Sequence, residues 1–575
     1  MTLDAFDFIV VGAGPSGATL ASTLAKAASR PTVLLLEAGS SDGSDELGRV
    51  AGERSFYFLS EHARSSVINY ETVPQENLNA QVIPYTRGRG LGGSSAVNFS
   101  MWTIPPKEWH DEIAARTGNR QWSWANAQKR YMRVESTRLA DIPSEYGQYL
   151  QPKPEDLGKV AGGIKVGFPH KFEDSLLPEL DAWREVDGLR VNPDSNDGDT
   201  IGLSVCWNSI HDGRRSTAAD MLSDTSELPN LTILKDTHVT RVFFEELVAV
   251  GVVTAGGTIH RASKEVILCC GTLDTPKLLM HSGIGPAGQL SKFGIPPVRE
   301  NNHIGQHLHD HCNAPWVLAR SPASLRSIRT DFYRSKAAQA EALSQWKKDR
   351  TGPLAEISGV IGLVLQRLDA IDESEEAKQL AQTSDGEYLR QPGIPPFEII
   401  LNGPNFGHYH VPDKLPPSQA YTIVLVATQS RGEVTLQSSD PSIPLLFNPK
   451  IFSHPYDRRV AIEASKYLMD VLERPTYSKD TTGRIRWPAG RSDEELLEYW
   501  RQNTKSTWHM CGTVRMGQNG EDSCVDNKFR VWEVQRLRVA DLSVLPVIPP
   551  AHPQTVAYLA GLMMADQLVH EYDLD

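Results

Sequence analysis

The N-terminal residues carry a pattern suited to binding the phosphates of a nucleotide. Residues 6–11 form a short apolar run rich in branched side chains, which predicts a buried strand that leads directly into Gly12, Gly14 and Gly17. Residues 18–28 predict a helix, and residues 32–36 predict a second buried strand. In such a unit Gly12 permits the tight turn, Gly14 lets the backbone approach a pyrophosphate, and Gly17 lets helix and strand close together. The spacing therefore predicts a dinucleotide-binding βαβ unit.

An acidic residue, Glu37, ends the second predicted strand. A carboxylate there accepts hydrogen bonds from ribose hydroxyls and repels a 2′-phosphate, so NADP is disfavoured. The unit alone does not distinguish FAD from NAD. A second glycine-rich stretch, residues 87–98, offers clustered backbone N–H groups that suit an anion, although its composition also suits a flexible surface loop.

Several motifs together carry a resemblance to a known family. Residues 87–98 and 271–285 resemble the two signatures of the glucose-methanol-choline (GMC) oxidoreductases, and residues 508–517, 537–541 and 552–555 resemble the C-terminal part of that family. The resemblance covers nearly the whole chain and is greatest to the aryl-alcohol and hydroxymethylfurfural oxidases. It implies FAD as the cofactor. The residues expected to bind FAD are Gly12, Gly14, Ser16, Gly17, Glu37, Arg89, Gly92, Ser94, Ser95, Asn98, Val239, Ala540, Asp541, His552, Pro553 and Thr555.

The sequence departs from some family members at Val97, the position where they attach FAD covalently through a histidine. Valine has no nucleophilic nitrogen, so we expect the FAD to be bound non-covalently.

Two histidines are expected to perform the acid–base chemistry. Oxidation of an alcohol by hydride transfer requires removal of the hydroxyl proton, and histidine, with an ordinary pKa of about 6.5, suits that task. By the resemblance His509 is the base and His552 orients the alkoxide, although the two could share or exchange these roles. Pro553 is expected at the first position of a long C-terminal helix, whose dipole would stabilise negative charge on a reduced flavin.

The resemblance implies oxidation of an alcohol to an aldehyde or ketone, with hydride passing to flavin N5 and the reduced flavin reoxidised by O2 or by an artificial or quinone acceptor. A primary aryl or furanyl alcohol is the first substrate class. The alternatives are a sugar dehydrogenase or oxidase of the glucose type, and a lyase or cyclase of the same family that keeps FAD without using its redox chemistry. Choline is disfavoured because His552 stands where choline enzymes carry asparagine.

The substrate is expected to meet aromatic side chains, which are Trp508, Tyr409 and Phe406. His307, His309 and His311 alternate and would share one face of a strand, an arrangement that could ligate a metal. We assign them a structural role and expect no metal, because this stretch resembles a domain crossover of the family.

The expected fold is α/β: a Rossmann-like FAD-binding domain of the GMC type, with a second α+β substrate domain built on an antiparallel sheet. Alternating apolar residues over 397–426 and 432–436 predict that sheet. The FAD-binding domain is expected to be discontinuous, over residues 1–155, 206–315 and 503–575. The substrate domain is expected over 156–205 and 316–502.

Composition narrows the classes of partner. The 575 residues carry a net charge of −13, which repels nucleic acid and anionic membrane surfaces, so a small-molecule alcohol is the expected partner. The N-terminus has no signal-peptide pattern, so we expect a cytoplasmic protein, or a secreted one if a leader precedes these residues. No apolar run is long enough to span a bilayer. The sequence does not indicate the oligomeric state.

Overall fold

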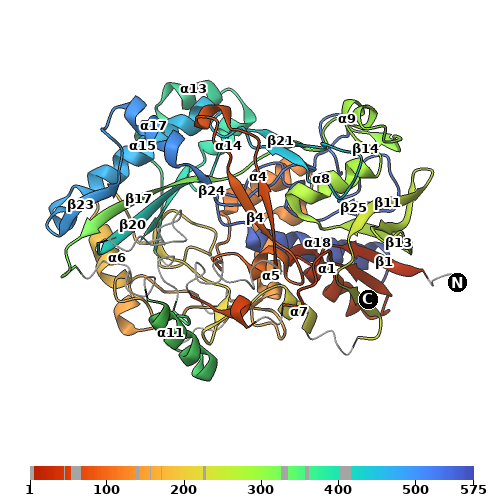
Figure 1. The fold of residues 1–575 in the computed structure, drawn as a ribbon, viewed down its shortest axis with the longest axis horizontal. Coiled ribbons are helices and arrows are strands. Elements are labelled where there is room, and N and C mark those ends of the chain that lie inside the picture. Colours follow the sequence, from red (N-terminus) through yellow and green to blue (C-terminus); the bar gives the residue numbers. More distant parts are fainter. Residues whose placement is uncertain are drawn as a thin grey trace.

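The structure, a computed structural model, describes residues 5–43, 46–52, 66–137, 142–153, 155, 157–169, 171–223, 228–324, 335–356, 362–401 and 416–575. Two seven-stranded sheets form its framework, one in each half of the molecule as drawn in Figure 1.

The first sheet is built mainly from parallel strands. Its order is β10 (Leu231–Leu234), β2 (Val33–Leu36), β1 (Phe6–Val11), β13 (Ile259–Leu268), β12 (Val248–Thr254) and β11 (Val239–Glu245), and β25 (Leu537–Val539) also pairs with β13. The strands from β10 to β13, and β25, run parallel, whereas β11 and β12 are antiparallel. The central strands β1 and β2 are almost wholly buried, which explains their continuous apolar sequences. This arrangement confirms the predicted βαβ unit and the α/β fold class.

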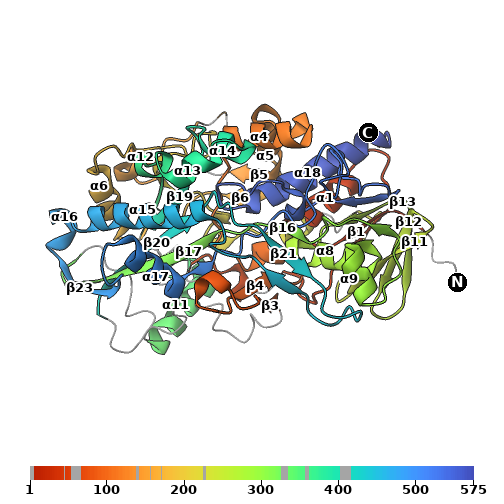
Figure 2. The same cartoon turned by 90° about the horizontal axis from the view of Figure 1, so that it is seen from above.

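Helices cover the first sheet. Helix α1 (Pro15–Ala25) leaves the end of β1 and packs against α18 (Gln554–Glu571), and α8 (Gly271–His281) follows β13 and packs on β11. All three helices lie beside the strands of the first sheet in both views (Figures 1 and 2). Helix α18 begins at Gln554 with Pro553 as its cap, one residue later than the sequence predicts.

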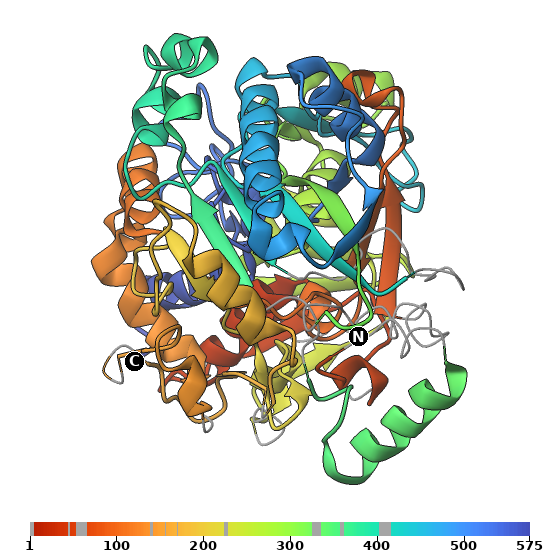
Figure 3. The same ribbon diagram turned by 90° about the vertical axis from the view of Figure 1, so that its left-hand side faces the viewer.

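The second sheet is antiparallel throughout. Its order is β23 (Thr481–Arg486), β17 (Cys312–Arg320), β20 (Ser418–Leu425), β19 (Phe397–Leu401), β18 (Gly362–Gln366) and β7 (Gly202–Val205), and β24 (Lys505–Ser506) also pairs with β17. Helices α15 (Pro455–Leu472) and α17 (Asp493–Asn503) lie over its strands, as Figure 3 shows in blue. The antiparallel pairing within residues 397–426 agrees with the prediction.

Shorter elements complete the fold. They are α4 (Lys107–Thr117), α5 (Trp124–Val134), α6 (Leu176–Arg184), α7 (Ala219–Ser223), α9 (Ala287–Lys292), α11 (Lys336–Asp349), α12 (Asp369–Asp372), α13 (Glu375–Leu380), α14 (Ser384–Leu389), α16 (Pro475–Ser478), β3 (Val67–Glu71), β4 (Pro84–Gly88), β5 (Glu135–Thr137), β6 (Ile164–Val166), β8 (Ile210–His211), β9 (Arg214–Arg215), β14 (Ile284–Gly285) and β15 (Arg299–Glu300). Within the described residues, no helix combines the length and apolar character that a membrane crossing requires.

Two local predictions were wrong. Residues 432–436 contribute β21 (Gly432–Thr435), which pairs with β16 (Gln306–Leu308) and β22 (Leu446–Asn448) in a separate small sheet. His307, His309 and His311 do not share one strand, because β16 ends at Leu308, β17 begins at Cys312, and His307 has a left-handed backbone (φ 63°). The three histidines alternate with other residues across this break between the strands. Alternation in the sequence therefore does not indicate a strand here.

The contact between α1 and α18 depends on Gly561, and this gives a test of the fold. A Cβ atom on Gly561 would lie 2.2 Å from the Ser16 carbonyl oxygen, a contact with backbone that side-chain movement cannot relieve. We expect Gly561→Ala to lower the free energy of unfolding by about 1–3 kcal/mol through overpacking. The measurement is the thermal unfolding midpoint.

Gly288→Ala is the matched control, because Gly288 is also helical and a Cβ there meets no atom within 4 Å. Alanine is the better helix former by about 1 kcal/mol, so this variant should be as stable as the parent or more stable. An unchanged midpoint in Gly561→Ala would contradict the close packing of α1 and α18.

Candidate active site

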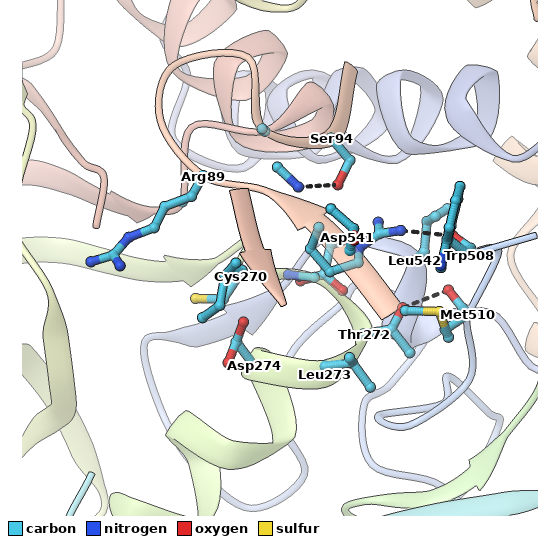
Figure 4. A pocket seen from close by; sticks show the side chains of 18 of the residues that line it. Arg89, Ser94, Cys270, Thr272, Leu273, Asp274, Trp508, Met510, Asp541 and Leu542 are labelled. Carbon is cyan, nitrogen blue, oxygen red and sulfur yellow. Dashed lines mark hydrogen bonds between the residues drawn. The ribbon is translucent and has the colours of Figure 1, made fainter. Parts of the chain in front are cut away.

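A cavity of about 820 Å³ lies between the two sheets. Its wall runs from Glu37, Arg89 and Val239 at one end to His509 and His552 at the other. Figure 4 shows part of this wall, with Arg89 and Cys270 toward one side, Trp508 toward the opposite side and Asp541 between them. The volume lies within the range of ligand pockets.

The three glycines of the first motif have different surroundings. Gly12 has a left-handed backbone (φ 101°), and a Cβ on it would lie 2.4 Å from the Cys269 carbonyl oxygen. A Cβ on Gly17 would lie 1.9 Å from the Gly12 carbonyl oxygen. Gly14, by contrast, lines the cavity and has no atom within 4 Å of the Cβ position. The free space therefore lies beside Gly14, at the N-terminus of α1, where unpaired N–H groups favour an anion.

Glu37 joins the loops around this end of the cavity. It follows β2, and its buried carboxylate accepts backbone N–H bonds from Ala13 at 2.9 Å, Gly39 at 2.8 Å and Gly90 at 3.0 Å. Burial raises the pKa of Glu37, and the three N–H donors oppose that shift. The carboxylate is thus held at the cavity wall with its remaining lone pairs available to ribose hydroxyls.

The second glycine-rich stretch packs on the first. A Cβ on Gly93 would lie 2.7 Å from the Gly14 Cα, so the two glycine loops touch. Asn98, at the end of this stretch, donates to Gln554 Oε1 at 2.9 Å and accepts from Arg215 at 2.6 Å. Val97, which lines the cavity, is buried. The stretch is therefore a fixed wall of the cavity.

Most residues expected to bind FAD line the cavity, but four lie behind its wall. Gly17 and Gly92 support the first glycine turn, since Gly17 packs on Gly12 and Gly92 donates to the Ala13 carbonyl at 2.9 Å. The Ala540 carbonyl accepts from Ser16 Oγ, and Thr555 Oγ1 donates to the Thr103 carbonyl at 2.8 Å. Direct contact with a ligand in the cavity is therefore not expected for these four. Phe406 and Tyr409 lie outside the described residues.

His509 and His552 face each other at the other end of the cavity. His509 follows β24, His552 precedes α18, and their ring centroids lie 4.8 Å apart with an interplanar angle of 81°. Burial and the neighbouring His552, His311 and Arg87 hold the pKa of His509 well below its usual value. His509 is therefore a neutral imidazole at neutral pH.

A third histidine lies behind His509. The two Nδ1 atoms of His311 and His509 are 2.9 Å apart, and burial lowers the pKa of His311 to about 3. One of the two neutral rings must carry a proton on Nδ1 and donate a hydrogen bond to Nδ1 of the other ring. This hydrogen bond leaves Nε2 as the nitrogen of His509 that a ligand can reach.

A carboxylate lies behind His552. Glu398 comes from β19, is 1% exposed, and its Oε1 lies 3.0 Å from His552 Nε2. The His552 backbone N–H also donates to Thr103 Oγ1 at 2.8 Å. The two histidines therefore have different partners. His509 contacts the neutral ring of His311, and His552 contacts the carboxylate of Glu398.

Asp310 fixes the loop that carries His509. Its buried carboxylate accepts from Tyr85 at 2.6 Å, Ser506 at 2.5 Å and the His509 backbone N–H at 2.9 Å. Burial raises the pKa of Asp310 to about 6, opposed by these donors. Trp508, between Ser506 and His509, has a left-handed backbone (φ 60°).

Trp508 supplies an aromatic wall beside the histidines. Its ring stacks on Phe99 with an interplanar angle of 5° and a centroid separation of 6.3 Å, and both residues line the cavity. Arg87 donates to the Trp508 carbonyl at 2.7 Å, a bond drawn in Figure 4. Trp508, which the sequence predicts as a substrate contact, therefore lines the cavity, and Phe99 adds a second ring that was not predicted.

The contacts of His311, Asp310 and Glu398 with the two histidines were not predicted from the sequence. The sequence predicted only a structural role for His311, together with His307 and His309. Within the described residues, no three His, Cys, Asp or Glu side chains are grouped to hold a metal. Glu398 could have been found as the one charged residue in the apolar strand 397–401. No acidic residue was anticipated in this part of the cavity.

The comparisons with known proteins indicate a single family. The sequence matches the GMC oxidoreductase family over residues 6–313 and again over residues 428–561. Patulin synthase of Penicillium expansum is 27% identical, over 98% of this chain and 91% of that protein. An alcohol dehydrogenase [acceptor] of Pseudomonas putida is 27% identical, over 99% and 96%. The crystal structure of a formate oxidase superposes with a TM-score of 0.87 at 29% identity, over 100% of both chains.

Proposed function

Since the chain belongs to the GMC oxidoreductase family and is an FAD-dependent oxidoreductase, we propose that it oxidises a primary aryl or furanyl alcohol to the aldehyde. The observation that carries this proposal is the pair His509 and His552, which meet at the cavity wall with each ring held from behind. The stacked rings of Phe99 and Trp508 beside them favour a flat, unsaturated substrate.

The residues around the cavity fit FAD. The free space at Gly14, beside the N-terminus of α1, suits the pyrophosphate, and Glu37 suits the adenosine ribose. Ser94, Asn98 and the cap of α18 would line the flavin side. When bound, FAD supplies the two-electron acceptor that takes a hydride from the carbinol carbon.

The protein's own residues would handle the proton. His509 Nε2 accepts the hydroxyl proton when His509 Nδ1 carries the proton and donates to His311, because the lone pair is then on Nε2 and points into the cavity. His552, whose Nε2 is held by Glu398, presents Nδ1 to the substrate oxygen. With a proton on Nδ1, it donates a hydrogen bond to the oxygen as negative charge develops there.

We propose that FAD is bound non-covalently, because Val97 offers no nucleophile at the cavity wall. Acid precipitation of the purified protein should release all of the flavin into the supernatant. The measurement is the flavin absorbance of the pellet and the supernatant. Yellow colour that stays with the precipitated chain would contradict this expectation.

The substrate class is tested by mixing the oxidised holoenzyme anaerobically with benzylic, furanyl, sugar and choline alcohols and following the flavin absorbance. We expect benzylic or furanyl alcohols to bleach the flavin, and readmitted oxygen then distinguishes an oxidase from a dehydrogenase by the rate of recolouring. Bleaching by sugars alone would replace our substrate class with the sugar alternative. No bleaching by any alcohol would favour a reaction that does not use the redox chemistry of FAD.

In the same assay His509→Ala should keep FAD bound but reduce the rate constant of flavin reduction by roughly 10²–10⁴, the usual contribution of a general base. His570→Ala, which removes an exposed histidine near the end of α18, is the matched control and should react like the parent. Near-normal flavin reduction in His509→Ala would remove the base assignment.

The lowered pKa of His509 predicts an unusual pH profile. The base works in its neutral form, and its pKa lies well below 6.5, so the rate of flavin reduction should stay level as the pH falls through 6.5. The rate should decrease only at more acidic pH. Stopped-flow reduction with saturating substrate measures this profile.

His552→Gln should move the acidic limb of the profile to higher pH, because a neighbouring group that lowers the pKa of His509 is lost. A midpoint at or above 6.5 in the parent enzyme would contradict the burial effect. Tryptophan fluorescence at each pH controls for unfolding.

A further inference from the structure

The second sheet presents a row of polar side chains to the cavity. Lys505 on β24 is paired with Asn313 on β17, so their side chains are neighbours on one face of the sheet. Thr422 on β20 lies on the same face, because it is two residues from Val424, the partner of Asn313. All three of these polar residues line the cavity that contains His509 and His552. We call Lys505, Asn313 and Thr422 the polar wall.

The polar wall has unused hydrogen-bonding capacity. Asn313 is 5% exposed and Thr422 is 1% exposed, and among the described residues neither Asn313 Oδ1 nor Thr422 Oγ1 has a hydrogen-bond partner. Within the part of the chain that the structure describes, the Lys505 ammonium also has no hydrogen-bond or ion-pair partner. Buried polar atoms without partners destabilise a fold. Two such atoms and a half-buried ammonium on one wall of a cavity indicate that a ligand completes them.

The charge at the polar wall is positive. Lys505 is half-buried, and burial together with the nearby Arg486 lowers the pKa of its ammonium group. The carboxylate of Glu398 does not neutralise it, because Glu398 is bonded to His552 and stands three strands away in the same row, roughly 14 Å along the sheet. An anionic group on the ligand would be attracted to Lys505 and repelled by Glu398.

We propose that the polar wall binds a carboxylate on the substrate, so that the substrate is a primary alcohol with a carboxylate at the end remote from the carbinol. This inference rests on the proposed alcohol oxidation. The carboxylate accepts from the Lys505 ammonium and the Thr422 hydroxyl, while the carbinol lies at His509 and His552. Asn313 Oδ1, an acceptor, is then available to a further N–H of the same ammonium. Glu398 excludes the reversed orientation, since it would bring two carboxylates together.

The test compares two alcohols of similar shape and different charge, 4-(hydroxymethyl)benzoate and 4-(hydroxymethyl)benzamide. Anaerobic stopped-flow reduction of the holoenzyme gives the ratio of the reduction rate constant to Kd for each. We expect the parent enzyme to prefer the benzoate by about ten- to a hundredfold, the effect of one charge-assisted hydrogen bond. Lys505→Gln should remove the preference, because the value for the benzoate should fall much more than the value for the benzamide.

Matched variants control for charge and folding. Lys378→Gln removes one exposed positive charge from α13, away from the cavity, and should keep the preference. Lys505→Arg keeps the charge and should keep most of the preference. If Lys505→Gln fails to fold, Thr422→Val tests the same wall, because it removes the hydroxyl at nearly constant volume, and it should lower the preference several-fold.

A binding measurement separates this inference from the proposed function. Calorimetric titration of the oxidised holoenzyme with 4-methylbenzoate and 4-methylbenzamide, which have no hydroxyl to oxidise, should show tighter binding of the benzoate in the parent and equal binding in Lys505→Gln. Equal oxidation and equal binding of the charged and neutral compounds by the parent would overturn the polar wall as a carboxylate site and leave alcohol oxidation intact. Preferential binding of 4-methylbenzoate without bleaching by any alcohol would support the anion site and overturn the proposed function.

Discussion

The position of the active site depends on the buried carboxylate of Asp310. It lies in the segment that leads into β17, and it receives hydrogen bonds from Tyr85 of β4, Ser506 of β24 and the backbone of His509. Three segments that are far apart in the sequence therefore meet at one group. The donors offset the penalty for burying a charge. Because the His509 backbone N–H is one of these donors, the same contacts that join the second sheet to its neighbouring loops also fix the position of His509.

The environments of the two active-site histidines differ although the side chains are chemically identical. His509 is backed by the neutral ring of His311 and is buried among groups that lower its pKa, so it is available as a proton acceptor. His552 is backed by the carboxylate of Glu398, which holds its Nε2. The resemblance to the family left the two roles exchangeable, and these different partners support the proposal that His509 is the base and His552 orients the substrate oxygen.

The dinucleotide end of the cavity could be predicted from sequence because its determinants are local. Gly12, Gly14 and Glu37 lie within one βαβ unit, and their roles follow from backbone geometry that the motif alone specifies. The partners of the histidines are not local: His311 is 198 residues from His509, and Glu398 is 154 residues from His552. No periodicity links such pairs. In the case of His311 the periodicity was misleading, because its alternation with His307 and His309 imitated a strand where the chain turns at a left-handed residue.

The same distinction explains why the family is evident from the sequence and the substrate is not. The residues expected to bind the cofactor lie largely in glycine turns such as those at Gly12 and Gly14, and such turns leave recognisable motifs. The wall that would meet the substrate consists of single side chains from different strands of an antiparallel sheet, such as Asn313 of β17, Thr422 of β20 and Lys505 of β24. Each of these residues looks like an ordinary strand residue in its own segment, since alternation only says which face it occupies. Their common role depends on the register of the strands, which places the three polar side chains on one face of the sheet at the cavity, and that register is a property of the folded chain.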